Sequence, residues 1–183
     1  MRIISGLLKG RNIKGFDIEG TRPTMDRVKE SMFATIQNNL KDSTCLDLFC
    51  GSGNLGIEAI SNGSKLCYFV DNNPKAIKVV EENIKNLNIK SNTKVFNYDY
   101  KKSLKYFNEN NIKFDLIFAD PPYDYHVIEK VIKYVSEYSL LNDNGLLILE
   151  FEKEHLEESY GKLKLIKYKK YSLKYVYIYK NEK

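Results

Sequence analysis

Four consecutive residues, Asp120-Pro121-Pro122-Tyr123, could position an amino group for chemistry. They follow residues 114–119, a near-continuous apolar run that predicts a strand covered on both faces. Two successive prolines fix two φ angles and remove two N–H donors, so the loop is stiff and presents mainly acceptors. Such acceptors suit the exocyclic NH2 of a purine and can hold its nitrogen as it attacks a methyl group in line with a departing sulfur. Tyr123 has the ring needed to stack on the base.

This chemistry needs no strong base, because the nitrogen becomes positive only during the attack. It can lose its proton afterwards to Asp120 or to water. Carbon methylation of a pyrimidine would instead call for a nucleophilic cysteine in this loop, and the loop has none. A paired base would first have to be unstacked or extruded.

A glycine motif lies upstream, within residues 45–60, where the pattern predicts a strand, a tight turn and a helix. Gly51, Gly53 and Gly56 match G-x-G-x-x-G, which is typical of both dinucleotide-binding folds and methyltransferases. Glycine can take a positive φ and lets the backbone approach a ligand. Asp47 stands where a pyrophosphate would be repelled, so it favours a cationic ligand such as S-adenosylmethionine.

Two further acids follow predicted strands. The strand 65–70 leads to Asp71, which lies about 20 residues past the first glycine, where an acid can accept hydrogen bonds from both ribose hydroxyls. The strand 93–97 leads to Asp99, which could accept the exocyclic amine of an adenine. It could equally cap the helix that is expected from Lys101.

Other predicted elements must position these residues. They are a β-hairpin within residues 1–18 (Arg2–Ser5 and Arg11–Lys14), a helix from Met25 to Leu40 with Thr24 as its N-cap, helices at 74–87 and 127–138, a strand at 146–151, and a terminal antiparallel pair at 162–168 and 171–179. In the first long helix, a core face is predicted for Met25, Val28, Met32, Ile36 and Leu40.

Basic residues concentrate near both ends of the chain. Arg2, Lys9, Arg11 and Lys14 occur in the first fifteen residues with no acid among them, and an exposed basic ribbon suits a phosphate backbone. Edge-strand cations that prevent aggregation are the alternative. Arg22, ahead of the first long helix, could reach a carboxylate or be an ordinary surface arginine. Eight lysines lie between residues 162 and 183, against one acid.

The composition predicts a globular protein of one domain, because the chain has 183 residues, 43% of them hydrophobic and 29% charged. No apolar run approaches the ~20 residues that span a bilayer, and the N-terminus lacks the apolar region of a signal peptide, so we expect a cytoplasmic protein. A net charge of +5 mildly favours an anionic partner. Cys45, Cys50 and Cys67 lack metal-type spacing, so we expect buried free thiols.

These motifs together make the chain similar to class I S-adenosylmethionine-dependent methyltransferases. More closely, it resembles the RsmD family, bacterial enzymes that methylate the exocyclic N2 of a guanine in 16S (small-subunit) ribosomal RNA. The resemblance covers nearly the full length and is carried by Arg2-Ile3-Ile4-Ser5-Gly6, Lys9-Gly10-Arg11, Thr21-Arg22-Pro23-Thr24, Arg27-Val28-Lys29-Glu30, Leu46-Asp47-Leu48-Phe49, Gly51-Ser52-Gly53 and the Asp120 loop. Lys29 stands where the family usually has an arginine.

The resemblance implies an α/β, Rossmann-like fold: a seven-stranded, mostly parallel sheet with the last strand antiparallel and helices on both faces. A basic N-terminal β-hairpin extension (1–20) would precede a catalytic core (21–183) in a single domain. The implied cofactor is S-adenosyl-L-methionine, with S-adenosyl-L-homocysteine as product and no metal. The implied partner is 16S rRNA within a small-subunit assembly particle, bound by a monomer.

The resemblance also implies site residues. Catalysis would fall to Asp120, Pro121, Pro122 and Tyr123. Cofactor contacts would come from Arg22, Thr24, Asp47, Phe49, Gly51, Ser52, Gly53, Asp71, Asn72 and Asp99. RNA contacts would come from Arg2, Lys9, Arg11 and Lys14.

Three other functions stay open at this point. An adenine-N6 methyltransferase acting on DNA or RNA would use the same acceptor loop, although 183 residues leave no room for a separate DNA target-recognition domain. An oxidoreductase would use the glycine motif for a dinucleotide. A binding protein could keep the fold without catalysis, against which the intact Asp120 loop counts.

Overall fold

The computed structural model describes residues 1–16, 26–121, 125–152, 156–172 and 174–183. Of the residues singled out above, Thr21, Arg22, Pro23, Thr24, Met25, Pro122 and Tyr123 lie outside the described residues. The described helices are α1 (Asp26–Ile36), η1 (Gln37–Asn39), α2 (Asn54–Ser61), α3 (Pro74–Leu87), η2 (Lys90–Asn92), α4 (Tyr100–Glu109) and α5 (Tyr125–Glu137). None of them is long and apolar enough to cross a membrane.

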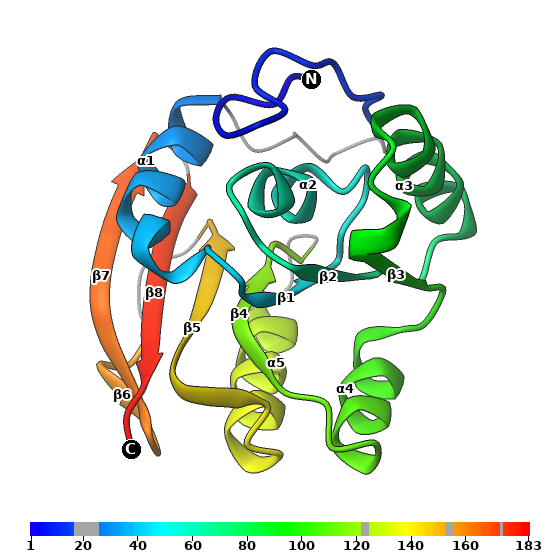
Figure 1. The fold of residues 1–183 in the computed structure, drawn as a ribbon. Coiled ribbons are helices and arrows are strands. Elements are labelled where there is room, and N and C mark those ends of the chain that lie inside the picture. The colour runs from blue at the N-terminus through cyan, green and yellow to red at the C-terminus, as the bar shows by residue number, and fades with distance from the viewer. Residues whose placement is uncertain (17–25, 122–124, 153–155, 173) are drawn as a thin grey trace.

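The strands form one mixed sheet at the centre of the molecule (Figure 1). They are β1 (Thr44–Leu48), β2 (Leu66–Val70), β3 (Thr93–Phe96), β4 (Phe114–Ala119), β5 (Leu141–Phe151), β6 (Ser159–Tyr160), β7 (Leu163–Tyr171) and β8 (Lys174–Asn181). Their order across the sheet is β3-β2-β1-β4-β5-β8-β7-β6. The first five strands are parallel to one another, and β8 is antiparallel to β5, which confirms a mostly parallel α/β sheet with an antiparallel last strand.

The sheet has eight strands in the described residues where seven are expected. The additional strand is β6, whose two residues pair only with Lys164 and Leu163. The predicted fifth strand also starts earlier, at Leu141, because Gly145 lies within it at a register irregularity rather than in a turn before it.

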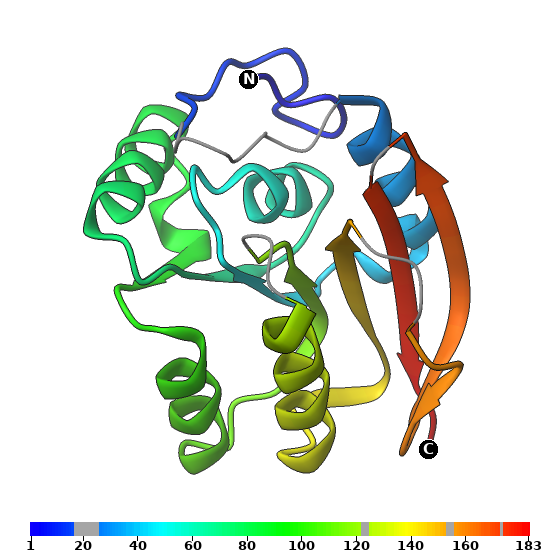
Figure 2. The same ribbon diagram turned by 180° about the vertical axis from the view of Figure 1, so that it is seen from behind.

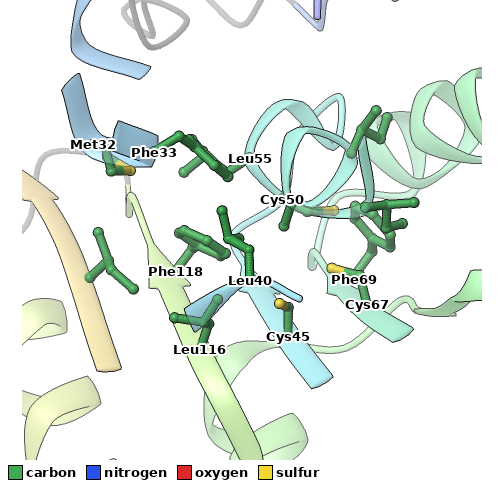
Figure 3. Packing of buried hydrophobic residues seen from close by; sticks show 14 of the residues in the cluster. Met32, Phe33, Leu40, Cys45, Cys50, Leu55, Cys67, Phe69, Leu116 and Phe118 are labelled. Atoms are coloured by element: carbon green, nitrogen blue, oxygen red, sulfur yellow. The ribbon is translucent and has the colours of Figure 1, made fainter. Parts of the chain in front are cut away.

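Helices cover both faces of the sheet, with α1, α2 and α3 on one side and α4 and α5 on the other (Figures 1 and 2). Successive residues of β1 point to opposite faces, so Cys45 joins the core under the first group while Leu46 and Leu48 join the second. In the first core the rings of Phe33 and Phe118 stack with centroids 5.6 Å apart (Figure 3). Two separate apolar layers therefore hold the sheet between the helices.

Burial of the cysteines confirms the expectation for them. Cys45, Cys50 and Cys67 are free and buried. Burial raises the pKa of the Cys45 thiol to about 11. The three thiols are therefore core side chains.

Local capping explains which helices are predicted well. Helix α3 has the predicted bounds, because the side chain of Asn73 accepts the Lys75 N–H at its start, Pro74 occupies the first position, and Asn88 ends it in the left-handed conformation. The predicted helix 25–40 is instead α1 followed by the short η1, since Asn38 and Asn39 are poor helix formers and the last turn tightens. Its predicted core face is confirmed for Val28, Met32, Ile36 and Leu40, which are all buried.

The N-terminal β-hairpin prediction is wrong in detail. The chain does turn back on itself, but one isolated bridge, Arg2 to Asn12, replaces the two expected strands. The reason is that donors of this segment bond elsewhere: the N–H groups of Ile4 and Ser5 donate to Glu58, and that of Leu7 donates to the Ser61 carbonyl. The N-terminal segment (residues 1–16) is therefore a loop fastened to α2.

Candidate active site

Four acids predicted to line a site lie at one edge of the sheet. The last residues of β1, β2, β3 and β4 are in register, as the pairs Leu48↔Val70, Val70↔Phe96 and Leu48↔Ala119 show. Asp47, Asp71, Asp99 and Asp120 therefore lie at the carboxyl ends of four adjacent strands. The strand order reverses between β1 and β4, which is where open α/β sheets form a ligand crevice. Asp47 and Asp120 flank that point.

The three motif glycines have different roles. Gly51 and Gly53 take positive φ angles of 54° and 83°. A Cβ on Gly53 would lie 2.5 Å from the Val80 side chain, and one on Gly56 would lie 2.4 Å from the Phe69 ring, so these two glycines allow α2 to pack closely. A Cβ on Gly51 would meet nothing within 4 Å. Gly51 is thus the glycine of the three with open space on its Cβ side, where a ligand can approach.

Asp47 lies under the turn rather than on the surface. Its side chain is 3% exposed, and its Oδ2 accepts the Gly56 N–H at 2.8 Å. Burial raises the pKa of Asp47 to about 7, an effect that the Gly56 hydrogen bond opposes and the charge of Asp71 reinforces. A cation bound nearby would favour the charged form of this carboxyl group.

Asp71 holds the glycine turn in place. Its Oδ2 accepts the Gly51 N–H and its Oδ1 accepts the Asn73 N–H, both at 2.9 Å. The carboxylate remains partly exposed, and each oxygen has further lone pairs that can accept hydroxyl groups. The neighbouring Asn72 is exposed.

Asp99 caps α4, because its Oδ1 accepts the N–H groups of Lys101 at 2.8 Å and Lys102 at 3.2 Å. It is exposed, so the cap does not exclude a ligand contact by the same carboxylate. Close to it, the Phe49 ring lies 5.5 Å from the Tyr100 ring. Phe49 has a φ of 69°, so the left-handed backbone of the turn begins at this residue. Acid and rings together border the edge of the crevice.

Ser52 lies between the turn and α3. It is buried, and its carbonyl accepts a hydrogen bond of 3.0 Å from the Asn83 side chain. The same amide group also donates to the Lys14 carbonyl at 3.0 Å. Asn83 therefore links the glycine turn to the N-terminal segment.

Asp120 has two partners that sequence reasoning missed. The Lys174 Nζ lies 3.6 Å from Asp120 Oδ2 and 2.5 Å from Glu150 Oε1. Glu150 is 1% exposed, whereas the side chains of Lys174 and Asp120 are 18% and 28% exposed. Burial raises the pKa of Asp120 well above its usual range, with a further rise from Glu150 that the Lys174 ammonium opposes. Two carboxyl groups thus share one ammonium at the end of β4, next to the buried Pro121.

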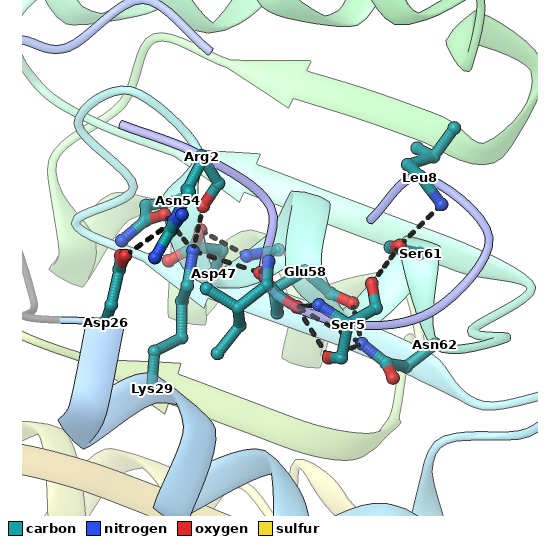
Figure 4. A network of polar contacts seen from close by, with 12 residues as sticks. Arg2, Ser5, Leu8, Asp26, Lys29, Asp47, Asn54, Glu58, Ser61 and Asn62 are labelled. Carbon is teal, nitrogen blue, oxygen red and sulfur yellow. Dashed lines mark hydrogen bonds and ion pairs between the residues drawn. The ribbon is translucent and has the colours of Figure 1, made fainter. Parts of the chain in front are cut away.

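The predicted RNA-contact residues lie on the N-terminal segment, and three of them bind this chain itself. Arg2 pairs with Asp26 at 2.9 Å, as Figure 4 shows, and Lys14 pairs with Glu82 at 2.9 Å. The Arg11 guanidinium donates to the Asn86 carbonyl at 3.1 Å. Lys9 is exposed.

A buried ion pair, also missed from the sequence, fastens the N-terminal segment (Figure 4). Lys29 and Glu58 are 1% and 0% exposed and lie 3.0 Å apart. The Lys29 ammonium also donates to the Arg2 carbonyl and to Asn54 Oδ1, both at 2.8 Å. Glu58 accepts the N–H groups of Ile4 and Ser5. The contacts that the structure gives Lys29 are therefore structural ones, to Glu58, Arg2 and Asn54.

Comparisons with known proteins agree with this geometry. Residues 1–180 match the family described as Conserved hypothetical protein 95. YlbH of Bacillus subtilis (strain 168) is 39% identical over 181 residues, which are 98% of this chain and 98% of YlbH. Ribosomal RNA small subunit methyltransferase D of Haemophilus influenzae is 36% identical over 155 residues, which are 84% of this chain and 80% of that protein. The solved structure of yhhF from Escherichia coli has a TM-score of 0.87 and 27% identity, and the match covers 100% of this chain and 98% of that one. The chain therefore belongs to the RsmD/YlbH family of methyltransferases, the Conserved hypothetical protein 95 family.

Proposed function

We propose that this protein transfers a methyl group from S-adenosyl-L-methionine to the exocyclic N2 amine of a guanine in 16S (small-subunit) ribosomal RNA. The observation that carries the proposal is the position of Asp120. It stands on the opposite side of the β1/β4 crevice from the glycine turn, next to Pro121. The relationship to ribosomal RNA small subunit methyltransferase D supports the choice of RNA.

The residues around the turn fit the methyl donor. Gly51 leaves room for its backbone to be approached, Asp71 can accept ribose hydroxyls, and Asp99 or the Phe49 ring can contact the adenine. Asp47, Ser52, Gly53 and Asn72 complete the proposed contacts, together with Arg22 and Thr24. When bound, the donor supplies an activated methyl carbon and a sulfonium leaving group.

Asp120 holds the nucleophile in the proposed reaction. Its carboxylate and the carbonyls of the proline loop accept the N–H groups of the guanine amine, which turns the nitrogen lone pair toward the methyl carbon. The N–C bond forms as the C–S bond breaks, and the sulfur leaves as a neutral thioether. The amine then releases one proton to Asp120 or to water. Tyr123 would stack on the base.

Lys174 and Glu150 are proposed as positioning residues for Asp120. The Lys174 ammonium is 2.5 Å from Glu150 and 3.6 Å from Asp120. It is therefore held mainly by Glu150, and it orients the carboxylate of Asp120. Burial and the charge of Glu150 raise the pKa of Asp120, and the positive charge of Lys174 opposes that rise. Lys174 thus favours the charged, accepting form of Asp120, to which the amine proton can pass in the proposed reaction. We also propose that residues 1–183 act as one catalytic domain and as a monomer.

The test is methyl transfer to defined acceptors. Small subunits from cells that lack the protein would be incubated with labelled S-adenosyl-L-methionine, and the RNA would be digested and analysed for modified nucleosides. The expected product is N2-methylguanosine in small-subunit RNA. Label in N6-methyladenine, or in duplex DNA supplied in parallel, would replace the proposed substrate with an adenine amine. Asp143→Ala, at an exposed acid in β5 near the other edge of the sheet, is the matched control for Asp120→Ala.

A further inference from the structure

Strand β7 is a lysine-rich strand at the outer part of the sheet. Its nine residues contain Lys164, Lys167, Lys169 and Lys170 and no acid. Strand β6 pairs only with its first two residues, and the Leu165 N–H donates to the Glu158 carbonyl just before β6, so the outer edge of β7 has no paired strand from residue 166 to residue 171 in the described residues. Its backbone and side chains are thus accessible to another molecule.

Two of these lysines contact hydroxyl groups rather than carboxylates. The Lys167 ammonium donates to the Thr35 hydroxyl at 2.6 Å, and the Lys169 ammonium donates to the Ser31 hydroxyl at 3.4 Å. No acid of the described residues lies within ion-pair distance of Lys167 or Lys169. Hydroxyl groups orient an ammonium without neutralising it, so both positive charges remain available to an anion.

Lys167 and Lys169 contact α1 on one face of β7, and an aromatic cluster lies on the other face, so the exposed edge between the two faces has cations on one side and rings on the other. Tyr168 is 40% exposed, and its ring lies 5.6 Å from that of Tyr175 with an angle of 12° between the planes. The Lys170 ammonium lies 5.2 Å from the centre of the Tyr175 ring. Cations that follow a backbone, interleaved with rings on which bases stack, are the usual pattern of single-stranded nucleic-acid sites.

The basic strand leads to the candidate active site. Strands β7 and β8 are antiparallel, and the last residue of β7, Tyr171, pairs with Lys174. Lys174 is the residue whose ammonium lies 3.6 Å from Asp120. The lysine-rich half of β7 therefore approaches the same edge of the sheet as the four acids (Figure 1).

We propose that β7 holds the phosphate backbone of the RNA substrate, with Lys167, Lys169 and Lys170 contacting phosphates and Tyr168 stacking on a base. This inference rests on the proposed function, because it takes RNA as the substrate. It adds a docking surface that lies on a different side of the candidate active site from the N-terminal segment. It also explains why a strand with an open edge keeps four lysines and no acid.

The experiment compares two triple variants that remove the same charge. Lys167→Gln, Lys169→Gln and Lys170→Gln are combined in the first. The control combines Lys65→Gln, Lys90→Gln and Lys113→Gln, which are exposed lysines at the amino ends of β2, β3 and β4. Binding to a small-subunit rRNA transcript is measured by fluorescence anisotropy across a series of salt concentrations, without methyl donor.

We expect the β7 variant to bind RNA roughly 10- to 100-fold more weakly than the wild type near 0.1 M salt. The slope of the logarithm of the binding constant against the logarithm of salt concentration should be smaller in magnitude by about 2 to 3, because each phosphate contact contributes about 0.7 to 0.9. The control should keep the wild-type slope to within about one contact. A third variant with arginine at the three β7 positions should restore binding. Equal slopes for the β7 variant and the control would overturn the inference, as would self-association of the β7 variant with unchanged RNA affinity, which would make the lysines protectors of a sheet edge.

Failure of this inference is distinguishable from failure of the proposed function. If the wild-type protein methylates the RNA and the β7 variant does so with unchanged KM, only the β7 surface is excluded. If no RNA is methylated by the wild type, the binding measurement still reports on the β7 surface by itself.

Discussion

The N-terminal segment and strand β7 are equally basic in sequence but differ in what their charges contact. In the N-terminal segment Arg2 and Lys14 pair with Asp26 and Glu82, and Arg11 donates to a carbonyl. In β7 the ammonium groups of Lys167 and Lys169 contact hydroxyls. A phosphate would have to displace a carboxylate from Arg2 or Lys14, but only a neutral hydroxyl from Lys167 or Lys169. A count of cations therefore says less about RNA binding than the identity of their neighbours.

The largest expected effect lies outside both regions and separates chemistry from docking. Asp120→Ala should lower the rate of methyl transfer by about 10³-fold or more, because the acceptor that orients the amine is lost. RNA affinity, measured by anisotropy, and donor affinity, measured by calorimetry, should stay near wild type. Undiminished turnover would refute the role of Asp120.

Lys174→Met should give a smaller loss of kcat together with a shifted pH profile, which a merely structural lysine would not cause.

The next effect concerns the attachment of the N-terminal segment. Lys29→Met should lower the free energy of unfolding by about 3 to 5 kcal/mol, because it leaves Glu58 buried without its cation. Denaturation with urea measures this, with Lys29→Arg as the charge-preserving control. Adding Glu58→Leu to Lys29→Met should recover part of the loss. If Lys29→Met and the β7 glutamine variant have the same free energy of unfolding, the prediction that Lys29 fastens the N-terminal segment is wrong.

A third case is the buried carboxyl group of Asp47, which has no ion-pair partner in the part of the chain that the structure describes. The folded pKa of Asp47 is about 7 against 3.8 for the ordinary group, so the folded state binds more protons between these values. Stability should fall as pH rises through this window. Asp47→Asn keeps the acceptor for the Gly56 N–H and should therefore raise the unfolding free energy at pH 8 by roughly 1 to 3 kcal/mol, with a smaller gain near pH 5. Thermal melting without donor at both pH values checks this, and an equal gain at both would contradict it.

The smallest expected effect tests the comparison directly. Asp26→Asn combined with Glu82→Gln should release Arg2 and Lys14 for phosphates and tighten RNA binding by about 3- to 10-fold, with a steeper salt dependence. Exposed pairs of this kind contribute only about 0.2 to 1 kcal/mol each, so folding should be unaffected. Unchanged RNA affinity in this variant would mean that the N-terminal segment does not reach the RNA.

Sequence patterns predicted the elements whose signals are local. Helix α3 has its cap, its proline and its terminal asparagine within the same sixteen residues. Strands β1 to β4 are short, and each has an acid near its carboxyl end. The edge of the sheet that carries Asp47, Asp71, Asp99 and Asp120 follows from those strands and from parallel pairing. The register Phe151↔Tyr175 brings β8 beside β5, and no local pattern specifies it.

The missed residues depend on such distant pairings. Glu150 interrupts the otherwise apolar run 146–151, and this was the available signal for a buried acid. Its partner Lys174 is 24 residues away and is one of eight lysines in the tail, so the sequence does not single it out. The prediction of two N-terminal strands was wrong for a related reason. Glu58, more than fifty residues away, accepts two of the N–H groups that would otherwise pair the two strands.

The ammonium of Lys29 connects the N-terminal segment to the start of α2. It holds the carbonyl of residue 2 and the side chain of Asn54, the residue that immediately follows the glycine turn. A displacement of the first residues of the chain would therefore reach the start of α2 through two hydrogen bonds. Under the proposed function, any RNA contact made by the N-terminal segment would be coupled through Lys29 to the glycine turn.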